Sequence, residues 1–242
     1  MSRDTLFTAD NSGDSPFEFT ESVAEVFPDM LKRSIPGYAA TIQAIGSLAS
    51  RYVQENSRCY DLGCSLGAAS AAILRNVAVD GVRLVAVDNA AAMVSRCQKN
   101  LGKLDAAKAS YSVLQADIQE VDIVRASMVV LNYTLQFLPL ADRAEMIARI
   151  ANGMNEGGVL VLSEKVVDED PTLEALLVEL HHDFKRRNSY SDMEIARKRA
   201  ALENVLVPET VADHIARLRE AGFRHCGVWL RYLNFVSLIA IR

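Results

Sequence analysis

The sequence predicts an α/β fold: a doubly wound, mostly parallel sheet of seven strands with helices on both faces. Short runs rich in β-branched residues alternate along the chain with longer segments of helical periodicity. These runs are almost continuously apolar, which is typical of parallel strands buried on both faces. The last two runs, His225–Tyr232 and Phe235–Ile241, are separated by only Leu233-Asn234 and therefore predict a C-terminal antiparallel pair at the sheet edge.

The first 52 residues precede this alternation. Ser22–Met30 and Gly37–Tyr52 carry apolar residues at helical spacing, and Pro36 with Gly37 interrupts the pattern between them. Because this part contains no strand-like run, we expect residues 1–52 to form a helical cover of a single domain that comprises residues 1–242.

Between residues 58 and 162 strands and helices alternate in order. The expected strands are the apolar runs Arg58–Leu62, Val82–Val87, Tyr111–Leu114, Ser127–Leu131 and Val159–Leu162. The helices expected between them, from the spacing of their apolar residues, are Ala68–Val77, Ala91–Leu101 and Ala141–Met154.

The C-terminal third departs from this rhythm. Residues 171–206 are helical in character, strongly charged and longer than a crossover connection needs. We expect a basic helical insertion there, within the domain and followed by a helix over Val211–Ala221. A long insertion without an obvious core partner often becomes an interface, so we also expect a homodimer in which residues 171–206 participate.

The composition argues against several classes of protein. Half of the residues are apolar and 24% are charged, which is ordinary for a soluble domain, and the net charge of −5 disfavours stable binding to nucleic acid. No apolar run is long enough to cross a membrane, and the polar N-terminus does not resemble a secretory signal. The four cysteines form no C-x-x-C pair, so we expect reduced thiols, no metal site and a cytoplasmic protein.

The segment Tyr60–Ser70, YDLGCSLGAAS, has two incompatible interpretations. As G-x-S-x-G it would be the nucleophile elbow of a hydrolase, with Ser65 as the nucleophile. As D-x-G-x-x-x-G it would be a glycine turn that lets a nucleoside approach the backbone. The hydrolase is disfavoured because none of the four histidines, which follow at 181, 182, 214 and 225, ends a predicted strand. NAD binding is disfavoured because G-x-G-x-x-G is absent.

Polar residues follow four successive strands, at the sheet edge where ligands of open α/β folds bind. After the glycine turn, Asp88 suits the two hydroxyls of a ribose, and Asp117 with Ile118 could read an adenine amino group and pack against its ring. Asn132 follows the next strand. Each aspartate could also be only a helix N-cap. Capping alone, however, does not require polar residues at the ends of four successive strands.

Several segments together resemble the class I S-adenosylmethionine-dependent methyltransferase fold over residues 58–242, namely DLGCSLG, VAVDNAAAM, QADI, VVLNYTLQFL, MNEGGVLVLSE and AGF. Segments outside this core, RDTLF, VAEVFPDMLKRSIPGY, HHDFKRRNSYSDMEIARKR and ALENV, resemble the bacterial carboxy-S-adenosylmethionine synthases. Glu156 stands where the wider family usually has proline. No N-P-P-Y follows the fourth strand, which removes the case for amide or exocyclic amine methylation.

This resemblance implies a homodimeric enzyme that converts S-adenosylmethionine and prephenate to carboxy-S-adenosylmethionine and phenylpyruvate. It also implies that a partner enzyme, a tRNA carboxymethyltransferase, uses the product on 5-hydroxyuridine at the tRNA wobble position. The cofactor contacts that the matching motifs imply are Tyr38, Gly63, Cys64, Ser65, Asp88, Asn89, Asp117, Ile118, Asn132 and Arg199. Asn132 would face the amino-acid or sulfonium end of the cofactor.

Prephenate is a dicarboxylate, and the product gains a carboxylate, so such a site needs fixed cations. The segment 185–199 supplies six, most of which we expect on a solvated helix face, with Arg199 on the transferred carboxylate. Glu164, Lys165 and His182 are further polar candidates without an assigned role, and no general base is assigned. Two alternatives remain open: an ordinary methyltransferase acting on a small molecule, and a catalytically silent adaptor.

Overall fold

The computed structural model describes residues 3–8, 17–104, 108–203 and 205–242. Its sheet has seven strands in the order β3-β2-β1-β4-β5-β7-β6. Strands β1 to β5 run parallel to one another, whereas β7 is antiparallel to both β5 and β6. This confirms the predicted fold class, including the C-terminal antiparallel pair. The strands are β1 (Arg58–Leu62), β2 (Val82–Asp88), β3 (Ala109–Gln115), β4 (Ala126–Asn132), β5 (Met154–Lys165), β6 (His225–Tyr232) and β7 (Phe235–Ile241).

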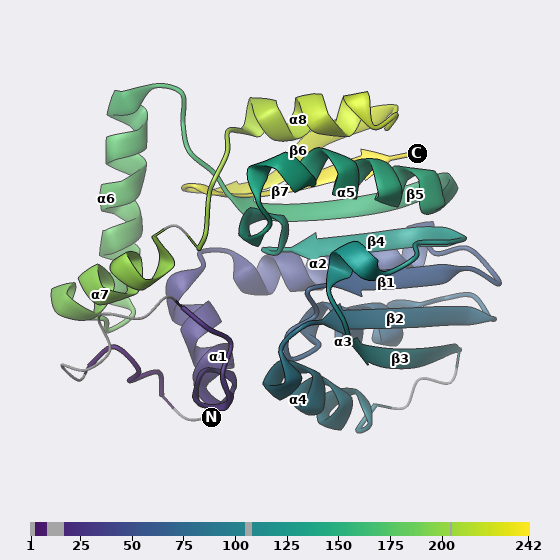
Figure 1. Cartoon of the computed structure of the whole chain (residues 1–242), viewed down its shortest axis with the longest axis horizontal. Coiled ribbons are helices and arrows are strands. Elements are labelled where there is room, and N and C mark those ends of the chain that lie inside the picture. The colour runs from purple at the N-terminus through teal and green to yellow at the C-terminus, as the bar shows by residue number, and fades with distance from the viewer. Residues whose placement is uncertain (1–2, 9–16, 105–107, 204) are drawn as a thin grey trace.

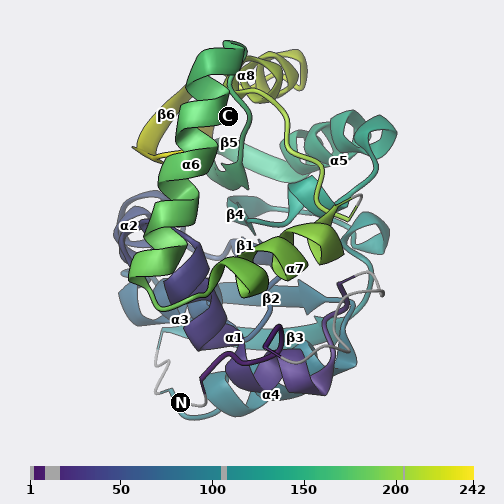
Figure 2. The ribbon, with the colours of Figure 1, turned by 90° about the vertical axis from the view of Figure 1, so that its left-hand side faces the viewer.

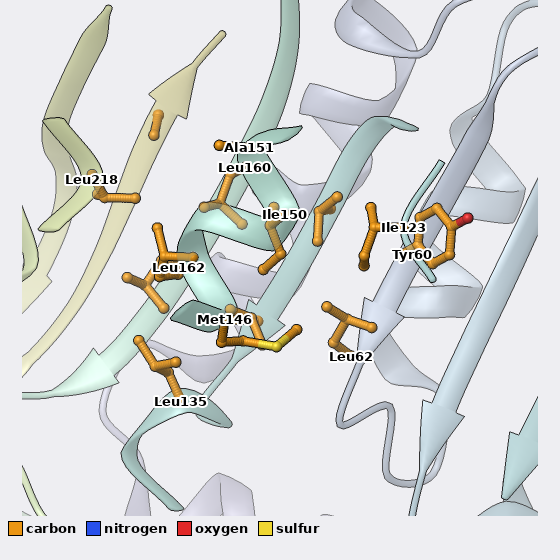
Figure 3. Packing of buried hydrophobic residues seen from close by; sticks show 14 of the residues in the cluster. Tyr60, Leu62, Ile123, Leu135, Met146, Ile150, Ala151, Leu160, Leu162 and Leu218 are labelled. Atoms are coloured by element: carbon orange, nitrogen blue, oxygen red, sulfur yellow. The ribbon is translucent and has the colours of Figure 1, made fainter. Parts of the chain in front are cut away.

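Helices cover both faces of the sheet (Figure 1). On one face, side chains such as Leu62 and Leu160 pack against Met146 and Ile150 of α5 (Leu140–Gly153) and Leu218 of α8 (Val211–Glu220), as Figure 3 shows. On the other face, the alternate residues of the same strands pack against α2 (Tyr38–Tyr52), α3 (Ala68–Asn76) and α4 (Ala91–Leu101). Burial on both faces explains the apolar runs of the central strands, whereas the edge strand β3 is only partly buried.

Three further helices lie beyond the carboxyl ends of the parallel strands, namely α1 (Glu21–Ser34), α6 (Pro171–Arg187) and α7 (Asp192–Leu202) (Figures 1 and 2). The α1 helix belongs to the predicted N-terminal cover, and α6 and α7 belong to the predicted insertion. Ser191 and Glu194 form a capping box that starts α7, and Asp170 caps α6. The three helices therefore stand over the edge at which ligands of this fold class bind.

Buried polar contacts hold these three helices together. Arg33, near the end of α1, donates to the backbone carbonyls of Asn188 and Ser189 in the α6–α7 connection, at 2.7 Å each. The Ser34 carbonyl lies 2.9 Å from Nε2 of His181 on α6, and the Ser34 hydroxyl accepts from Nζ of Lys198 on α7 at 2.9 Å. Because Arg33, Ser34, His181 and Lys198 are buried, these bonds fix α6 and α7 relative to α1.

The largest error in a predicted boundary lies at the start of β5. The helix expected to reach Met154 ends at Gly153, and β5 begins at Met154 rather than at Val159. A side chain at Gly153 would approach the Ile123 carbonyl oxygen to 2.0 Å, so the chain turns where only glycine fits. The polar, glycine-containing start of β5 does not resemble a buried strand, and the apolar pattern therefore begins late.

Among the described helices, none combines the length and the apolar character that crossing a bilayer would require.

Candidate functional site

A cavity of about 830 Å³ opens between the carboxyl ends of the parallel strands and helices α1, α6 and α7. Its walls include the turns after β1, β2, β3 and β4, the start of α2, and the facing sides of α6 and α7. All ten residues proposed from the sequence line it: Tyr38, Gly63, Cys64, Ser65, Asp88, Asn89, Asp117, Ile118, Asn132 and Arg199. The structure thus brings them together, and their contact with a ligand stays a prediction.

The turn after β1 is held tightly by its neighbours. The N–H groups of Gly63 and Cys64 donate to the Val87 carbonyl at 2.8 and 2.9 Å. Gly63 has φ of +80°, and a side chain there would lie 2.3 Å from Oγ1 of Thr134. Glycine is therefore required both for the left-handed backbone and for the close approach of the turn after β4.

Ser65 has the geometry of a turn residue and not of a hydrolase nucleophile. Its φ is +49°, its N–H donates to the Asp88 carboxylate at 2.8 Å, and its hydroxyl lies 3.5 Å from Sδ of Met93. A nucleophilic serine needs a hydrogen bond to a base, and a thioether cannot act as one. This agrees with the glycine-turn interpretation of the segment.

Asp61, at the end of β1, anchors the helix that follows the turn. Its carboxylate accepts from the Ser70 N–H at 2.9 Å and from the Ser70 hydroxyl at 2.6 Å. Burial raises the pKa of Asp61 to about 6, although both hydrogen bonds oppose the rise. Asp61 therefore fixes α3 behind the turn and keeps the cavity wall rigid.

Asp88 and Asp117 accept hydrogen bonds from backbone N–H groups and also line the cavity. Asp88 accepts from the Ser65 N–H with one oxygen and from the Ala90 N–H, at 3.0 Å, with the other. Each carboxylate oxygen can accept a second bond, so Asp88 can still receive ribose hydroxyls. Burial raises its pKa. Asp117 accepts from the Gln119 N–H at 2.9 Å as the cap of a short 3₁₀ helix, η2 (Ile118–Glu120).

Asn132, the last residue of β4, carries an unsatisfied group. Its Oδ1 is buried and has no hydrogen-bond partner within the described ranges. Buried polar atoms in folded proteins are nearly always paired, so an orphan acceptor on a cavity wall indicates a ligand that donates to it. The α-amino group of S-adenosylmethionine fits this requirement. The orphan oxygen and the acids on β2 and β3 together fit this cofactor.

Aromatic rings from the helical cover, from the turn after β4 and from β7 complete one wall. Tyr38, the first residue of α2, lies with its ring centroid 6.4 Å from that of Tyr133, and Tyr133 lies 6.0 Å from Phe235 at the start of β7. Burial raises the pKa of the Tyr38 phenol above its usual value. The phenol is therefore neutral and offers an O–H donor and acceptor to a ligand.

Cations gather on the opposite side of the cavity, on α6, α7 and the end of β5. Of the six cations of segment 185–199, most of which we expected on a solvated face, Lys185 and Lys198 are buried in the cavity wall and Arg199 lines the cavity at an exposed position. Arg186 instead forms exposed pairs with Asp183 and Asp192, at 2.7 Å each. The spacing of Lys185 four residues after the buried His181 was the sequence signal that could have identified it.

Burial lowers the pKa of Lys185 to about 7 and that of Lys198 to about 8. Neighbouring cations add to the shift at Lys185, whereas Asp4, 3.8 Å from Lys198, opposes it at Lys198. Arg199 is exposed at the rim of the cavity.

Of the three polar candidates without a role, Lys165 and His182 line the cavity and Glu164 does not. Glu164 is fully buried and accepts from the N–H groups of Leu135 and Gln136, at 3.1 and 3.0 Å, which fixes the turn after β4. Burial raises the pKa of Glu164 to about 8. The structure adds Asn234, in the β6–β7 turn, to the cavity wall.

The comparisons with known proteins agree with this architecture. Residues 60–158 match the sequence family described as a methyltransferase domain. An O-methyltransferase family protein from Burkholderia thailandensis superimposes with a TM-score of 0.65 at 15% identity, covering 92% of this chain and 59% of that longer chain. This second likeness shows the fold, which is that of the class I S-adenosylmethionine-dependent methyltransferases.

Curated relatives are much more similar. The carboxy-S-adenosyl-L-methionine synthase of Cronobacter sakazakii is 51% identical over 240 residues, covering 99% of this chain and 97% of that protein. The protein of the same name from Klebsiella pneumoniae is 49% identical with the same coverage. Identity of this extent includes α1, α6 and α7 as well as the shared core. The chain is therefore an enzyme that belongs to the carboxy-S-adenosyl-L-methionine synthase family.

Proposed function

We propose that this enzyme converts S-adenosyl-L-methionine and prephenate to carboxy-S-adenosyl-L-methionine and phenylpyruvate. The observation that carries the proposal is the division of charge across one cavity. Asp88 ends β2 and Asp117 follows β3. On the side of β5 and α6–α7, the cations Lys165, Lys185, Lys198 and Arg199 outnumber the two acids that line the cavity there, Glu174 and Glu203. A nucleoside suits the first side, and the carboxylates of prephenate and of the product suit the second.

Different residues bind the different parts of the cofactor and of the transferred group. In this proposal Asp88 receives the ribose, Asp117 and Ile118 receive the adenine, and Asn132 receives the amino-acid end of the cofactor. The backbone of residues 63–65 and the Tyr38 ring enclose the nucleoside, with Asn89 at the rim. Arg199 holds the transferred carboxylate through its planar guanidinium.

S-adenosylmethionine supplies a sulfonium-bound methyl group whose C–H bonds are weakly acidic. In the balanced reaction prephenate loses one carboxyl group and its ring hydroxyl, and the methyl carbon exchanges one hydrogen for that carboxylate. The departing hydroxide and proton form water. The protein holds both reactants together, excludes bulk water and stabilises carboxylate charge, and these effects account for large rate enhancements in other enzymes.

The direct test is the mass of the products. The purified enzyme, incubated with both substrates, should yield a cofactor heavier by one carbon dioxide, together with phenylpyruvate. An ordinary methyltransferase would instead accumulate S-adenosylhomocysteine with an acceptor, and an adaptor would yield neither. Absence of both the heavier cofactor and phenylpyruvate would refute the proposal.

We also propose a cytoplasmic homodimer whose product passes to a tRNA carboxymethyltransferase, without stable binding of nucleic acid by this enzyme. Support for the dimer comes from α6, on which Leu173, Leu176 and Leu180 are exposed at positions that share one helix face. The net charge of −5 supports the absence of nucleic-acid binding.

A further inference from the structure

Lys185 is a buried cation that the fold does not neutralise. It lies in the last turn of α6, is 8% exposed and lines the cavity. Within the described ranges its ammonium group has no carboxylate within 4.0 Å and no hydrogen-bond acceptor. The stem of Lys185 is buried while its Nζ keeps accessible surface toward the cavity, so an anion that enters the cavity can reach the ammonium group and supply the missing counter-charge.

A second unsatisfied group lies in the turn between β6 and β7. The side chain of Asn234 is 1% exposed, and neither its Nδ2 nor its Oδ1 has a partner in the described part of the chain. The turn itself is well fixed, because the Asn234 carbonyl accepts from the Val166 N–H at 2.8 Å. The amide lines the same cavity, so its donor and acceptor are available to a ligand.

Contacts between elements bring these two groups to one side of the cavity. His181, one turn before Lys185 on the same face of α6, places its ring 4.9 Å from that of Phe235, the residue after Asn234. Phe235 is also the register partner of Lys165 on β5. The end of α6, the end of β5 and the β6–β7 turn therefore converge.

We infer that Lys185 and the Asn234 amide, with Lys165 beside them, form a subsite that binds a carboxylate of a small dicarboxylic co-substrate, separate from the carboxylate held by Arg199. The inference rests on the proposed function and adds to it the residues that select the second substrate. The amide N–H and two ammonium groups can donate to one carboxylate, and the anion supplies the charge that Lys185 lacks. Strand order separates the subsite from the nucleoside side, since β5 and β7 lie beyond β4 whereas Asp88 ends β2.

Binding of an anion at this subsite changes the protonation of Lys185. In the free enzyme its pKa is about 7, lowered by burial and by the cations that face it. Those cations are Lys198 and Arg199 from α7 and Lys165 from β5. The imidazoles of His181 and His182 also face Lys185 from its own helix, and the pKa of each is lowered by burial and by neighbouring cations, so they add no charge near pH 7. A bound carboxylate favours the charged form and raises this pKa. The complex therefore takes up a proton above about pH 7, and its affinity falls as the pH rises further.

Calorimetric titration tests the inference without turnover. Prephenate is titrated into the enzyme saturated with S-adenosylhomocysteine, which has no methyl group to carboxylate, at several pH values and in buffers of different ionisation enthalpy. Lys185→Met should weaken prephenate about ten- to a hundredfold, and Asn234→Ala about tenfold. Lys185→Met should also abolish proton uptake above pH 7. Arg187→Met, which removes a charge from the same helix at an exposed position outside the cavity, should change the affinity less than about twofold.

Stability distinguishes a substrate-binding role from a structural one. Lys185→Met removes an unpaired buried charge, so its thermal midpoint should equal or exceed that of the wild type, with unchanged affinity for S-adenosylhomocysteine. A lower midpoint together with unchanged prephenate affinity would overturn the inference. Lys185→Arg keeps a charge that does not titrate, so it should retain binding and lose proton uptake; retained proton uptake in this variant would also overturn it.

The two proposals can fail separately. Malonate, a minimal dicarboxylate, is titrated into the same complexes. Malonate binding that depends on Lys185, in an enzyme that forms no carboxylated cofactor from prephenate, supports the subsite and removes prephenate as the substrate. Formation of the carboxylated cofactor with prephenate affinity that does not depend on Lys185 removes the subsite and leaves the function in place.

Discussion

Substituting Gly63 by alanine should destabilise the enzyme through two effects that the structure separates. The residue has φ of +80°, and a new Cβ would lie 2.3 Å from Oγ1 and 2.4 Å from Cγ2 of Thr134. The left-handed backbone alone costs a residue with a side chain roughly 1–2 kcal/mol. Overpacking of a tight site adds about 1–3 kcal/mol. The free energy of unfolding should therefore fall by about 2–5 kcal/mol.

A matched glycine isolates the steric part. Gly157 has φ of +75°, but a side chain there would meet only Nε2 of Gln54, at 3.7 Å. Gly157→Ala should lose about 1–2 kcal/mol, the backbone contribution alone. Urea denaturation of both variants measures the difference, provided that the slope of the free energy against urea stays unchanged.

The double variant Gly63→Ala/Thr134→Ala, compared with the two single variants, forms a double-mutant cycle that measures the coupling between the two positions. Removing the two nearest Thr134 atoms should recover about 1–2 kcal/mol of the loss in Gly63→Ala, and this would appear as a favourable coupling energy between the two positions. A Gly63→Ala loss no larger than that of Gly157→Ala, or a coupling energy near zero, would show that the turns after β1 and β4 are not in the close contact described.

Other substitutions test the site, the buried histidine and the assembly. Arg199→Ala should weaken the carboxylated cofactor about ten- to a hundredfold and S-adenosylmethionine much less, measured by calorimetry; equal losses would contradict the placement of Arg199 on the carboxylate. Burial lowers the pKa of His181 to about 3, so the unfolded state binds more protons between about pH 3 and 6.5, and stability falls as the pH drops through that window. His181→Gln should reduce that acid sensitivity, by up to about 1.4 kcal/mol per pH unit in urea denaturation, and an unchanged dependence of stability on pH would contradict this account. Leu176→Glu should convert the proposed dimer to a monomer by light scattering, and a dimer that persists would place the interface elsewhere.

The fold was predictable because its signals are local. The central strands β2 and β4 are buried on both faces and therefore mostly apolar, and glycines with positive φ mark the turns after β1 and before β2. The acids of the nucleoside side were predictable for the same reason. Asp88 and Asp117 end successive strands, and parallel strands bring their carboxyl ends to one edge.

The cationic side could not be identified in the same way. Lys198 is buried because Ser34 and Asp4 meet it, and both lie more than 160 residues away in the sequence. Lys185 is buried by the same packing of α1 against α6, and its charged neighbours on the chain resemble a solvated helix face. Asn234 occupies a tight hairpin turn, where asparagine is common for reasons of backbone geometry alone. Tertiary contacts, which a single sequence does not display, give these residues their environment.

The N-terminal segment supplies a counter-ion for one of the two buried lysines of the cavity. Asp4 is 1% exposed, accepts a hydrogen bond from the Tyr190 hydroxyl and stands 3.8 Å from Nζ of Lys198. Its carboxylate thus offsets one charge of the cationic side, whereas Lys185 has no such counter-ion within the described residues. If Lys185 and Lys198 both served only to stabilise the fold, each of them would need a carboxylate partner. The difference indicates that Lys198 is paired to hold α7 against the cover, and that Lys185 is left unpaired for an anion that arrives with the substrate.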